Sequence, residues 1–399
     1  MKSASPVDRG SENEAAQDSR GQTATKEKSM GMVVISGSGL WKPEEFVTNK
    51  ELVSSYNEFA SRFNAQNADA IAAGTLAEKP QSSSDFIVKA SGIRQRYTYR
   101  KEGILDVERM RPLLSVRADD ELSHQAEIAV HAAREAMEMA GRTAKGIDMV
   151  IVSCAYTERA YPAIAIEVQQ ALGIEGFGFD MLVACSFALH RAHDAVAVGS
   201  ARCALVINPE LITPQVNFKD RDSHFIFGDV STAMILELAD TCTAPHSYEI
   251  LATQAVTQYS SNVRSNFGHL SFASDSDPFA DDKLFCQDGR KVFREVCPLT
   301  SEHLAALLRN SGMDVSDVRR WWLHQANIHM NQLIMRRLLG REPNFDEAPI
   351  VLDEFANTAS AGSVIVFHLY HEDLMAGDTG VICSFGAGYS VGSLIVRKR

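Results

Sequence analysis

The segments HQAEIAVHAAREAMEMAG (124–141) and GIDMVIVSC (146–154) together decide the fold class. In the first, apolar residues recur at the spacing of an amphipathic helix, and the pattern stops at Gly141. The second is an uninterrupted apolar run with the length of a buried strand, as are CALVIN (203–208) and TAMILEL (232–238). Helices that alternate with such strands predict an α/β fold with mostly parallel sheets.

The second half of the chain repeats this order of elements. Segment 136–154 resembles segment 307–325, and Phe227-Gly228 with its following strand resembles Phe385-Gly386 with its own. Two pairs of similar segments in the same order predict an internal duplication, with a boundary near residues 240–250.

Length and composition divide the chain further. Its 399 residues favour two packed halves, which we place at residues 31–243 and 244–399. Residues 1–30 contain almost no large apolar side chain, so we expect a disordered tail. Segments 52–85 and 99–121 fit neither half and are expected to be insertions in the first half, either lids and subunit contacts or plain surface additions.

Charge and cysteine usage exclude several classes of protein. The net charge of -12 disfavours nucleic-acid binding. An apolar run of about 18 residues is not found, which argues against a membrane role. The N-terminus has no signal-like apolar core, so we expect a cytoplasmic protein. The seven cysteines are scattered and form no Cys-x-x-Cys pair, so we expect neither a disulfide framework nor a metal site.

Cys185 is the first candidate for chemistry. In FDMLVACSFALH (179–190) a short apolar run predicts a strand that leads directly into a helix beginning at Cys185. Unpaired amides and the dipole at a helix N-terminus would favour a thiolate. An inert cysteine in alanine-rich packing is the alternative, and this segment alone does not decide between them.

Three later segments supply polar groups. His324 in WWLHQAN (321–327) falls at an expected strand end facing a cleft, although a lone histidine is more often a core residue. Asn357 in ANTASAG (356–362) precedes an apolar helix and could equally be its cap. In CSFGAGYSVGS (383–393) a glycine bend between strands could aim an amide at an oxyanion or merely turn a hairpin.

Taken together, these motifs resemble a known family. Cys185, His-Gln-Ala-Asn at 324–327, Asn-Thr-x-Ser-Ala at 357–361 and the glycine bend at 385–388 are similar, in this order, to 3-oxoacyl-(acyl-carrier-protein) synthase III of the thiolase superfamily. The likeness extends from Met32 to Arg399. It implies a thiolase-like, duplicated five-layer αβαβα fold.

The resemblance also implies a mechanism. Cys185 would take an acyl group from an acyl-CoA, with the amides of Cys185 and Ala387 as the oxyanion hole. His324 and Asn357 would hydrogen-bond the malonyl thioester carbonyl and stabilise the enolate left by loss of carbon dioxide. The enolate would then attack the acyl group on Cys185, a decarboxylative Claisen condensation of fatty acid biosynthesis. An amide suits this role because a carboxylate at the same place would repel the enolate.

Substrate positions follow from the same resemblance. Arg221 matches a CoA-binding arginine, and Phe86 stands where an aromatic ring stacks on adenine. Tyr161 matches the aromatic residue that reaches into the partner subunit's acyl pocket, which implies a homodimer. Asn327 and Phe385 are expected to contact substrate. Acyl-CoA is then a substrate, and we expect no cofactor.

A basic pair is the candidate docking site for an acyl carrier protein. Arg336 and Arg337 match such a pair on the helix after His324, and a solvated helix face is the alternative interpretation. A carrier is acidic, so this acidic chain would need a local basic patch to bind it.

The chain departs from the family pattern at several positions. Ala90 and His329 each replace an arginine, and Ser186-Phe187-Ala188 brings bulk where a glycine is usual. Because these changes fall around the acyl pocket and its entrance, we expect a starter acyl group longer than acetyl.

Three other functions stay open from the sequence. A specialised condensing enzyme of secondary metabolism, polyketide- or quinolone-like, would share the triad. A papain-like amidase also uses Cys, His and Asn in this order but lacks the duplication and the glycine bend. A non-catalytic homologue that binds the carrier is the third.

Overall fold

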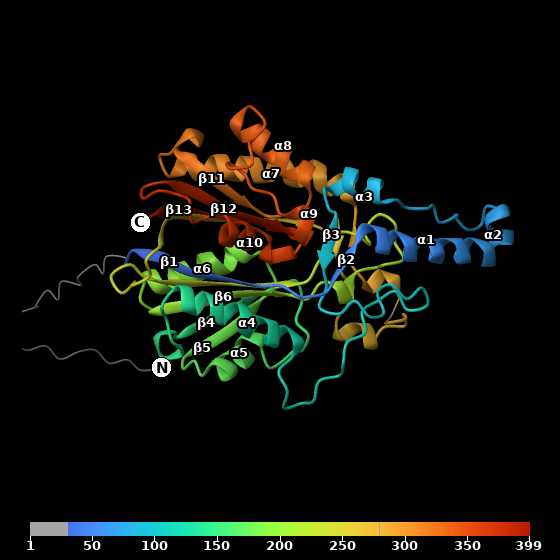
Figure 1. Ribbon diagram of the computed structural model, residues 1–399, viewed down its shortest axis with the longest axis horizontal. Coiled ribbons are helices and arrows are strands. Elements are labelled where there is room, and N and C mark those ends of the chain that lie inside the picture. The colour runs from blue at the N-terminus through green and yellow to red at the C-terminus, as the bar shows by residue number, and fades with distance from the viewer. Residues whose placement is uncertain (1–30, 279) are drawn as a thin grey trace, which may run out of the picture. The chain divides into compact units, whose positions relative to one another are not determined.

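The structure is a computed structural model that describes residues 31–278 and 280–399 (Figure 1). The predicted tail, residues 1–30, lies outside the described residues. Residues 31–399 form one compact unit. Within the described residues, no helix combines the length and the apolar character that a membrane span requires.

One mixed sheet forms the framework. Its nine strands lie in the order β11-β12-β13-β8-β1-β7-β6-β4-β5. The bounds are β1 Val33–Trp41, β4 Met149–Ser153, β5 Phe177–Met181, β6 Cys203–Glu210, β7 Val230–Leu238, β8 Tyr248–Ser260, β11 Val318–Leu323, β12 Thr379–Gly386 and β13 Gly388–Lys398. The short strands β2 Phe46–Thr48 and β3 Gln95–Tyr97 pair with each other, as do β9 Val263–Arg264 and β10 Cys286–Gln287.

The expectation of mostly parallel sheets is wrong. Strand β4 pairs in parallel with β5 and β6, and β11 pairs in parallel with β12, but the other neighbours in this sheet are antiparallel. Strands β6 and β7 follow one another along the chain without an α-helix between them, as do β12 and β13, so each pair is antiparallel. The apolar runs of β1, β7 and β13 are buried over most of their length, so composition could not distinguish these strands from parallel ones.

The strand order repeats between the two halves. From the centre outward, β1-β7-β6-β4 in the first half corresponds to β8-β13-β12-β11 in the second. The halves join where β1 pairs with β8, at Val34 opposite Glu249. This is the arrangement expected from duplicated strand–helix units.

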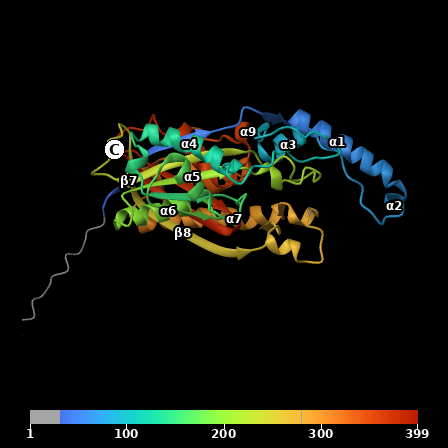
Figure 2. The ribbon, with the colours of Figure 1, turned by 90° about the horizontal axis from the view of Figure 1, so that it is seen from below.

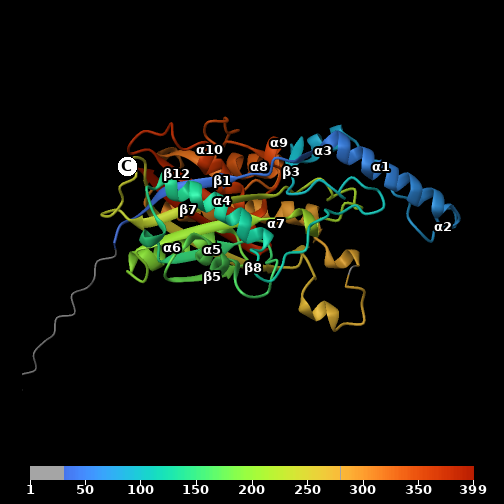
Figure 3. The same cartoon turned by 60° about the horizontal axis from the view of Figure 1, so that its bottom comes forward.

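Helices lie in three layers around the two half-sheets (Figures 1 and 3). Helices α4 (His124–Met139) and α5 (Ile164–Leu172) pack on the outer face of the first half. Helices α7 (Gly289–Asn310) and α8 (Ile328–Leu339) pack on the outer face of the second. Helices α6 (Cys185–Ala197) and α10 (Gly362–Leu369) are buried between the half-sheets, where they form the central core. The layers therefore read α-β-α-β-α, as predicted.

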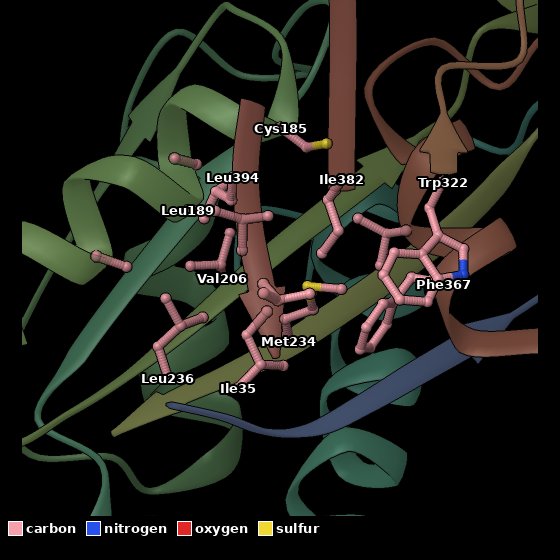
Figure 4. Packing of buried hydrophobic residues seen from close by; sticks show 14 of the residues in the cluster. Ile35, Cys185, Leu189, Val206, Met234, Leu236, Trp322, Phe367, Ile382 and Leu394 are labelled. Atoms are coloured by element: carbon pink, nitrogen blue, oxygen red, sulfur yellow. The ribbon is translucent and has the colours of Figure 1, made fainter. Parts of the chain in front are cut away.

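The central core brings Cys185 next to both half-sheets. It joins Leu189 and Val206 of the first half to Ile382 and Leu394 of the second, with Cys185 at one end of the cluster (Figure 4). Small residues along α6 let the half-sheets approach this helix closely. The nucleophile candidate is thus held by a layer shared between the halves.

The two predicted insertions differ in character. Residues 52–85 continue helix α1 (Asn49–Gln66) and add α2 (Ala68–Ala72), which extend away from the sheet (Figure 2). The chain then enters α3 (Ser84–Ser91). Residues 99–121 form neither helix nor strand. A fourth apolar cluster, which includes Leu52 and Ile87, anchors this region.

Candidate active site

Cys185 is the first residue of helix α6. Its side chain is fully buried, and Sγ lies 3.2 Å from Oγ of Ser363 on α10. The preceding strand β5 ends at Met181, so the strand does not run directly into the helix as the sequence predicts. The three intervening residues, 182–184, turn the chain inward. Because the first amides of a helix have no intrahelical acceptor, the N–H of Cys185 is available to an oxyanion.

The protonation of Cys185 differs from the expectation. Burial raises the pKa of its thiol, and hydrogen bonds from Ser363 and Ser384 only partly oppose this effect. The prediction of a thiolate favoured by the helix N-terminus is therefore wrong for the unliganded site, because removal from water outweighs the helix end. As the candidate nucleophile, Cys185 would start as a thiol and would have to lose its proton on attack.

His324 follows strand β11 directly, as predicted. Its N–H donates to the carbonyl of Cys383 on β12, at 2.8 Å, and its ring packs edge-on against Phe385. Burial lowers the pKa of His324 to about 4, with the backbone of Ala359 only partly opposing. The imidazole is therefore neutral at pH 7 and can donate one ring N–H to a carbonyl oxygen.

Asn357 is fixed by its backbone and by its own side chain. Its N–H donates to the Ile226 carbonyl at 2.9 Å, and its carbonyl accepts from Gly228 at 3.1 Å. The side-chain Oδ1 accepts from the N–H of Ala359 at 2.9 Å. The alternative that Asn357 caps the apolar helix is wrong, because the N-cap of α10 is Ala361 and no side chain caps it. The Asn357 oxygen instead closes the turn at Ala359, which leaves the Nδ2 group as the part of this side chain that can donate to a substrate.

The predicted residues converge on one chamber of about 980 Å³. His324, Asn357, Phe385 and Ala387 all line it. Ala184 lines it too, so the chamber wall includes the residue directly before Cys185. The Ala387 residue belongs to the tight connection between β12 and β13, so the glycine bend does face the chamber. Apolar side chains form much of the remaining wall, among them Phe225, Phe227, Phe285, Val292, Phe293 and Val296.

The predicted substrate residues divide into two groups. Phe86 and Asn327 line the chamber. The Arg221 guanidinium lies 3.8 Å above the Phe86 ring, so these two residues are neighbours. Asn327 has a structural task as well, since its amide donates to the Ala90 carbonyl and its oxygen caps α8.

Tyr161, Arg336 and Arg337 lie on the surface and outside the chamber wall. Tyr161 is 85% exposed. Arg336 is paired with Glu342 at 2.9 Å, which reduces the positive field expected from the arginine pair.

Sequence reasoning missed the polar residues behind the chamber. Glu210, the last residue of β6, lines the chamber and is fully buried. Ser360, Ser363 and Ser384 make contacts to Glu210, Cys185 and Ser186. An acidic residue that directly ends a buried apolar strand was the available signal for Glu210.

The duplicated five-layer fold, with a buried cysteine of one half next to a chamber lined by a histidine and an asparagine of the other, is that of a thiolase-fold condensing enzyme. The family model described as "3-Oxoacyl-[acyl-carrier-protein (ACP)] synthase III" matches residues 179–258, and its C-terminal counterpart matches residues 308–398. The chain belongs to the 3-oxoacyl-(acyl-carrier-protein) synthase III family.

Individual relatives agree with this assignment. A beta-ketodecanoyl-(acyl-carrier-protein) synthase of Pseudomonas aeruginosa is 53% identical over 349 residues, which cover 87% of this chain and 100% of that protein. A beta-ketoacyl-(acyl-carrier-protein) synthase III of Erythrobacter litoralis is 28% identical and covers 91% and 98%.

Solved structures show the same fold at low identity. A 3-oxoacyl-(acyl-carrier-protein) synthase III of Aquifex aeolicus superposes with a TM-score of 0.71 at 20% identity, covering 92% of this chain and 99% of that one. A priming beta-ketosynthase of the R1128 polyketide pathway also gives 0.71, at 22% identity, covering 92% and 97%.

Proposed function

We propose that this enzyme condenses an eight-carbon acyl-CoA with malonyl-acyl-carrier protein to give 3-oxodecanoyl-carrier protein, carbon dioxide and free CoA. The observation that carries the proposal is that His324 and Asn357 line one chamber with a large apolar wall, and that Ala184 of the same wall directly precedes the buried Cys185. The relative that is 53% identical is named for a ten-carbon product. Two of those carbons come from malonyl, so eight remain for the starter.

The first step is acyl transfer. The Cys185 sulfur attacks the acyl thioester, its proton passes to the departing CoA thiol, and the acyl group becomes bound to sulfur. The amides of Cys185 and Ala387 would stabilise the tetrahedral oxyanion. Acyl-CoA is consumed as a substrate, so the proposal requires no cofactor.

The second step is decarboxylative condensation. Neutral His324 and the Nδ2 group of Asn357 donate to the malonyl thioester carbonyl, which becomes the enolate oxygen as carbon dioxide leaves. The enolate carbon attacks the acyl carbonyl, and the Cys185 sulfur departs and regains a proton. Neither donor brings a negative charge to the enolate.

Acylation of Cys185 by a panel of acyl-CoA substrates tests the proposal. We expect octanoyl-CoA to give a mass increase on Cys185 faster than acetyl-CoA, and Cys185→Ala to give none. Turnover with malonyl-carrier protein but not with malonyl-CoA would distinguish fatty acid synthesis from a specialised condensing enzyme. Condensation of acetyl-CoA far faster than octanoyl-CoA would contradict the proposed length of the starter acyl chain.

We also propose that the enzyme is located in the cytoplasm.

Carrier docking at helix α8 is part of the proposal. Arg336 is paired with Glu342, whereas Arg337 on the same exposed turn has no partner among the ion pairs of the described residues. We therefore expect Arg337→Glu to raise KM for malonyl-carrier protein and to leave acylation by acyl-CoA unchanged. Arg319→Glu, also an exposed arginine of the second half, is the matched control. Equal effects of both substitutions would contradict docking at α8.

A homodimer through strand β5 also belongs to the proposal. Strand β5 is an edge of the sheet, and its Phe177 and Phe179 are 46% and 36% exposed. Leu182, directly after this strand, and Tyr161, before helix α5, are also exposed. Exposed apolar side chains on an unpaired edge strand favour association. We expect light scattering to give the mass of a dimer, and Phe179→Glu to give a monomer. A monomeric wild type at micromolar concentration would contradict this interface.

A further inference from the structure

Glu210 is a fully buried acid in the wall of the chamber that holds His324 and Asn357. Its Oε1 accepts from the N–H of Ser360 at 3.0 Å and lies 2.5 Å from the Ser360 hydroxyl. Its Oε2 accepts from the N–H of Ala155 at 3.1 Å. The carboxyl group therefore ties strand β6 to two loops that reach the chamber.

One of these loops carries Asn357. Ser360 belongs to the short 3-10 turn Ala359–Ala361, whose first N–H is already bound to the Asn357 side chain. A shift of Ser360 would therefore move Ala359 and release the Asn357 amide from its orientation. Glu210 acts on the chemistry through this turn.

The same contacts reach the loop before Cys185. The Ser360 hydroxyl lies 2.9 Å from the carbonyl of Ser153, and the Ser153 hydroxyl donates to the carbonyl of Val183 at 2.7 Å. Val183 is two residues before Cys185. One network of hydrogen bonds thus connects the turn after Asn357, which is proposed to act in condensation, with the loop before Cys185, which is proposed to act in acylation.

Proton counting within this network admits the neutral acid, with the Ser153 carbonyl also accepting from the Asn208 amide at 2.9 Å. The Ser360 hydroxyl has one proton and lies close to two oxygens, those of Ser153 and Glu210. The Ser153 carbonyl oxygen can only accept a hydrogen bond. If the Ser360 hydroxyl donates to that carbonyl, the short contact between the Ser360 hydroxyl oxygen and Glu210 Oε1 requires a proton on the carboxyl group.

The surroundings of Glu210 agree with that assignment. The titratable groups that face it are Cys154 and Tyr156 after β4, Asp229 before β7, and Cys185 on α6, and none of these is a cation. No ion pair to Glu210 occurs among the described residues. Burial raises its pKa to about 7, with the donors at Ser360 and Ala155 opposing and Asp229 adding to the shift.

We propose that Glu210, as a neutral carboxylic acid, is a positioning residue for the condensation step: it holds the Ser360 turn, and through it the Asn357 amide, without placing a negative charge beside the enolate. This inference rests on the proposed function, because it concerns the same condensation. Ionised Glu210 would oppose the enolate in a chamber of low dielectric constant, where charges interact strongly.

Single-turnover condensation separates this role from acylation. The enzyme is first acylated with octanoyl-CoA, freed of CoA, and mixed with malonyl-carrier protein between about pH 6 and pH 9, and loss of acyl-Cys185 is followed by mass spectrometry. In Glu210→Gln the amide nitrogen can donate to the Ser360 hydroxyl and the amide oxygen can accept from Ala155, so the Ser360 N–H alone loses its acceptor. Glu210→Ala leaves the Ser360 and Ala155 N–H groups unpaired.

The matched control is Glu237→Gln. Glu237 is likewise fully buried, on β7, but it pairs with Arg142 and does not line the chamber. Thermal unfolding of every variant is measured alongside turnover.

We expect wild-type condensation to fall as pH rises above about 7, and Glu210→Gln to keep its rate across that range. Glu210→Ala should lose about tenfold or more in condensation at every pH and retain acylation. Glu237→Gln should keep the wild-type profile.

Three results would overturn the proposal: a Glu210→Gln profile identical to wild type, a folded Glu210→Gln as slow as Glu210→Ala, or equal losses in Glu210→Ala and Glu237→Gln. If Glu210→Ala does not fold, Glu210→Gln alone decides. A wild type that forms no acyl-Cys185 would instead contradict the proposed function, and this inference with it.

Discussion

At the scale of single residues, Asn357 shows how one side chain combines two tasks. Its oxygen caps the turn at Ala359, which fixes the rotation of the amide, and the amide nitrogen remains for the substrate carbonyl. His324 is prepared differently, because burial keeps its imidazole neutral although the Ala359 backbone favours the protonated ring. The two donors are therefore both uncharged before malonyl arrives.

Asn357→Asp tests this arrangement. The aspartate can still cap Ala359, but its second oxygen would place a negative charge where the enolate forms, so we expect condensation to fall by about 100-fold or more. Acylation of Cys185 precedes enolate formation and should change little. Single-turnover rates of the two steps measure both effects.

Asn344→Asp makes the same chemical change at an exposed residue that caps the N–H of Glu347, and it serves as the control. A parallel loss of acylation and condensation in Asn357→Asp would show that the substitution disturbs the fold rather than the enolate.

At the scale of elements, strand β1 and helix α4 pack backbone against backbone. A methyl group on Gly39 would lie 2.1 Å from the carbonyl oxygen of Ala132, and one on Gly37 would lie 2.3 Å from that of Ala136. The glycines of the motif VVISGSGL (33–40) are therefore packing residues: they let an alanine-rich helix lie close to the sheet.

Gly39→Ala should accordingly destabilise the protein. Because the contact is with backbone and cannot be relieved by a side-chain rotation, we expect a loss of about 1–3 kcal/mol in the free energy of unfolding. Urea denaturation measures it. Gly146→Ala is the control, since its methyl group would meet only the Arg142 side chain at 3.6 Å. Equal stability of the two variants would contradict the close packing of α4 on β1.

At the scale of the whole molecule, the two halves make a site that neither contains alone. The first half supplies Cys185, the second supplies His324 and Asn357, and the central layer of α6 and α10 joins them. Burying this shared layer also buries ionisable groups, so the stability of the molecule depends on pH.

Four buried histidines determine that dependence in mild acid. Burial lowers the pKa values of His224, His303, His324 and His371 from 6.5 to about 4. Their stabilising contribution is complete above pH 6.5 and is lost as pH falls toward 4, at about 1.4 kcal/mol per pH unit for each. Glu210 acts in the opposite sense, because its raised pKa stabilises the fold as pH falls below about 7.

Denaturant titrations at several pH values test this balance. We expect the free energy of unfolding to decrease between about pH 6.5 and pH 5, because four histidines outweigh one glutamate. His303→Gln, which removes one such histidine away from the chamber wall, should make the decrease less steep. A flat profile in this range would contradict the neutral burial of these histidines.

The sequence by itself determined the elements and the motifs. Apolar periodicity located α4, β4, β6 and β7, and the echo between the halves anticipated the repeated strand order. These features depend on the spacing of residues that are close together in the sequence, so the sequence alone shows them. The motif order around Cys185, His324 and Asn357 likewise indicated the family.

Only the tertiary structure decided the strand directions, the burial of Cys185 and the contacts of Glu210. Each depends on what surrounds a group rather than on its neighbours in the chain. A buried antiparallel strand has the same composition as a parallel one, and a helix N-terminus lowers the pKa of a thiol only when burial does not outweigh it. The contacts of Glu210 come from Ser360 and Ala155, which are far from it in sequence and meet it only because the two halves pack around one layer.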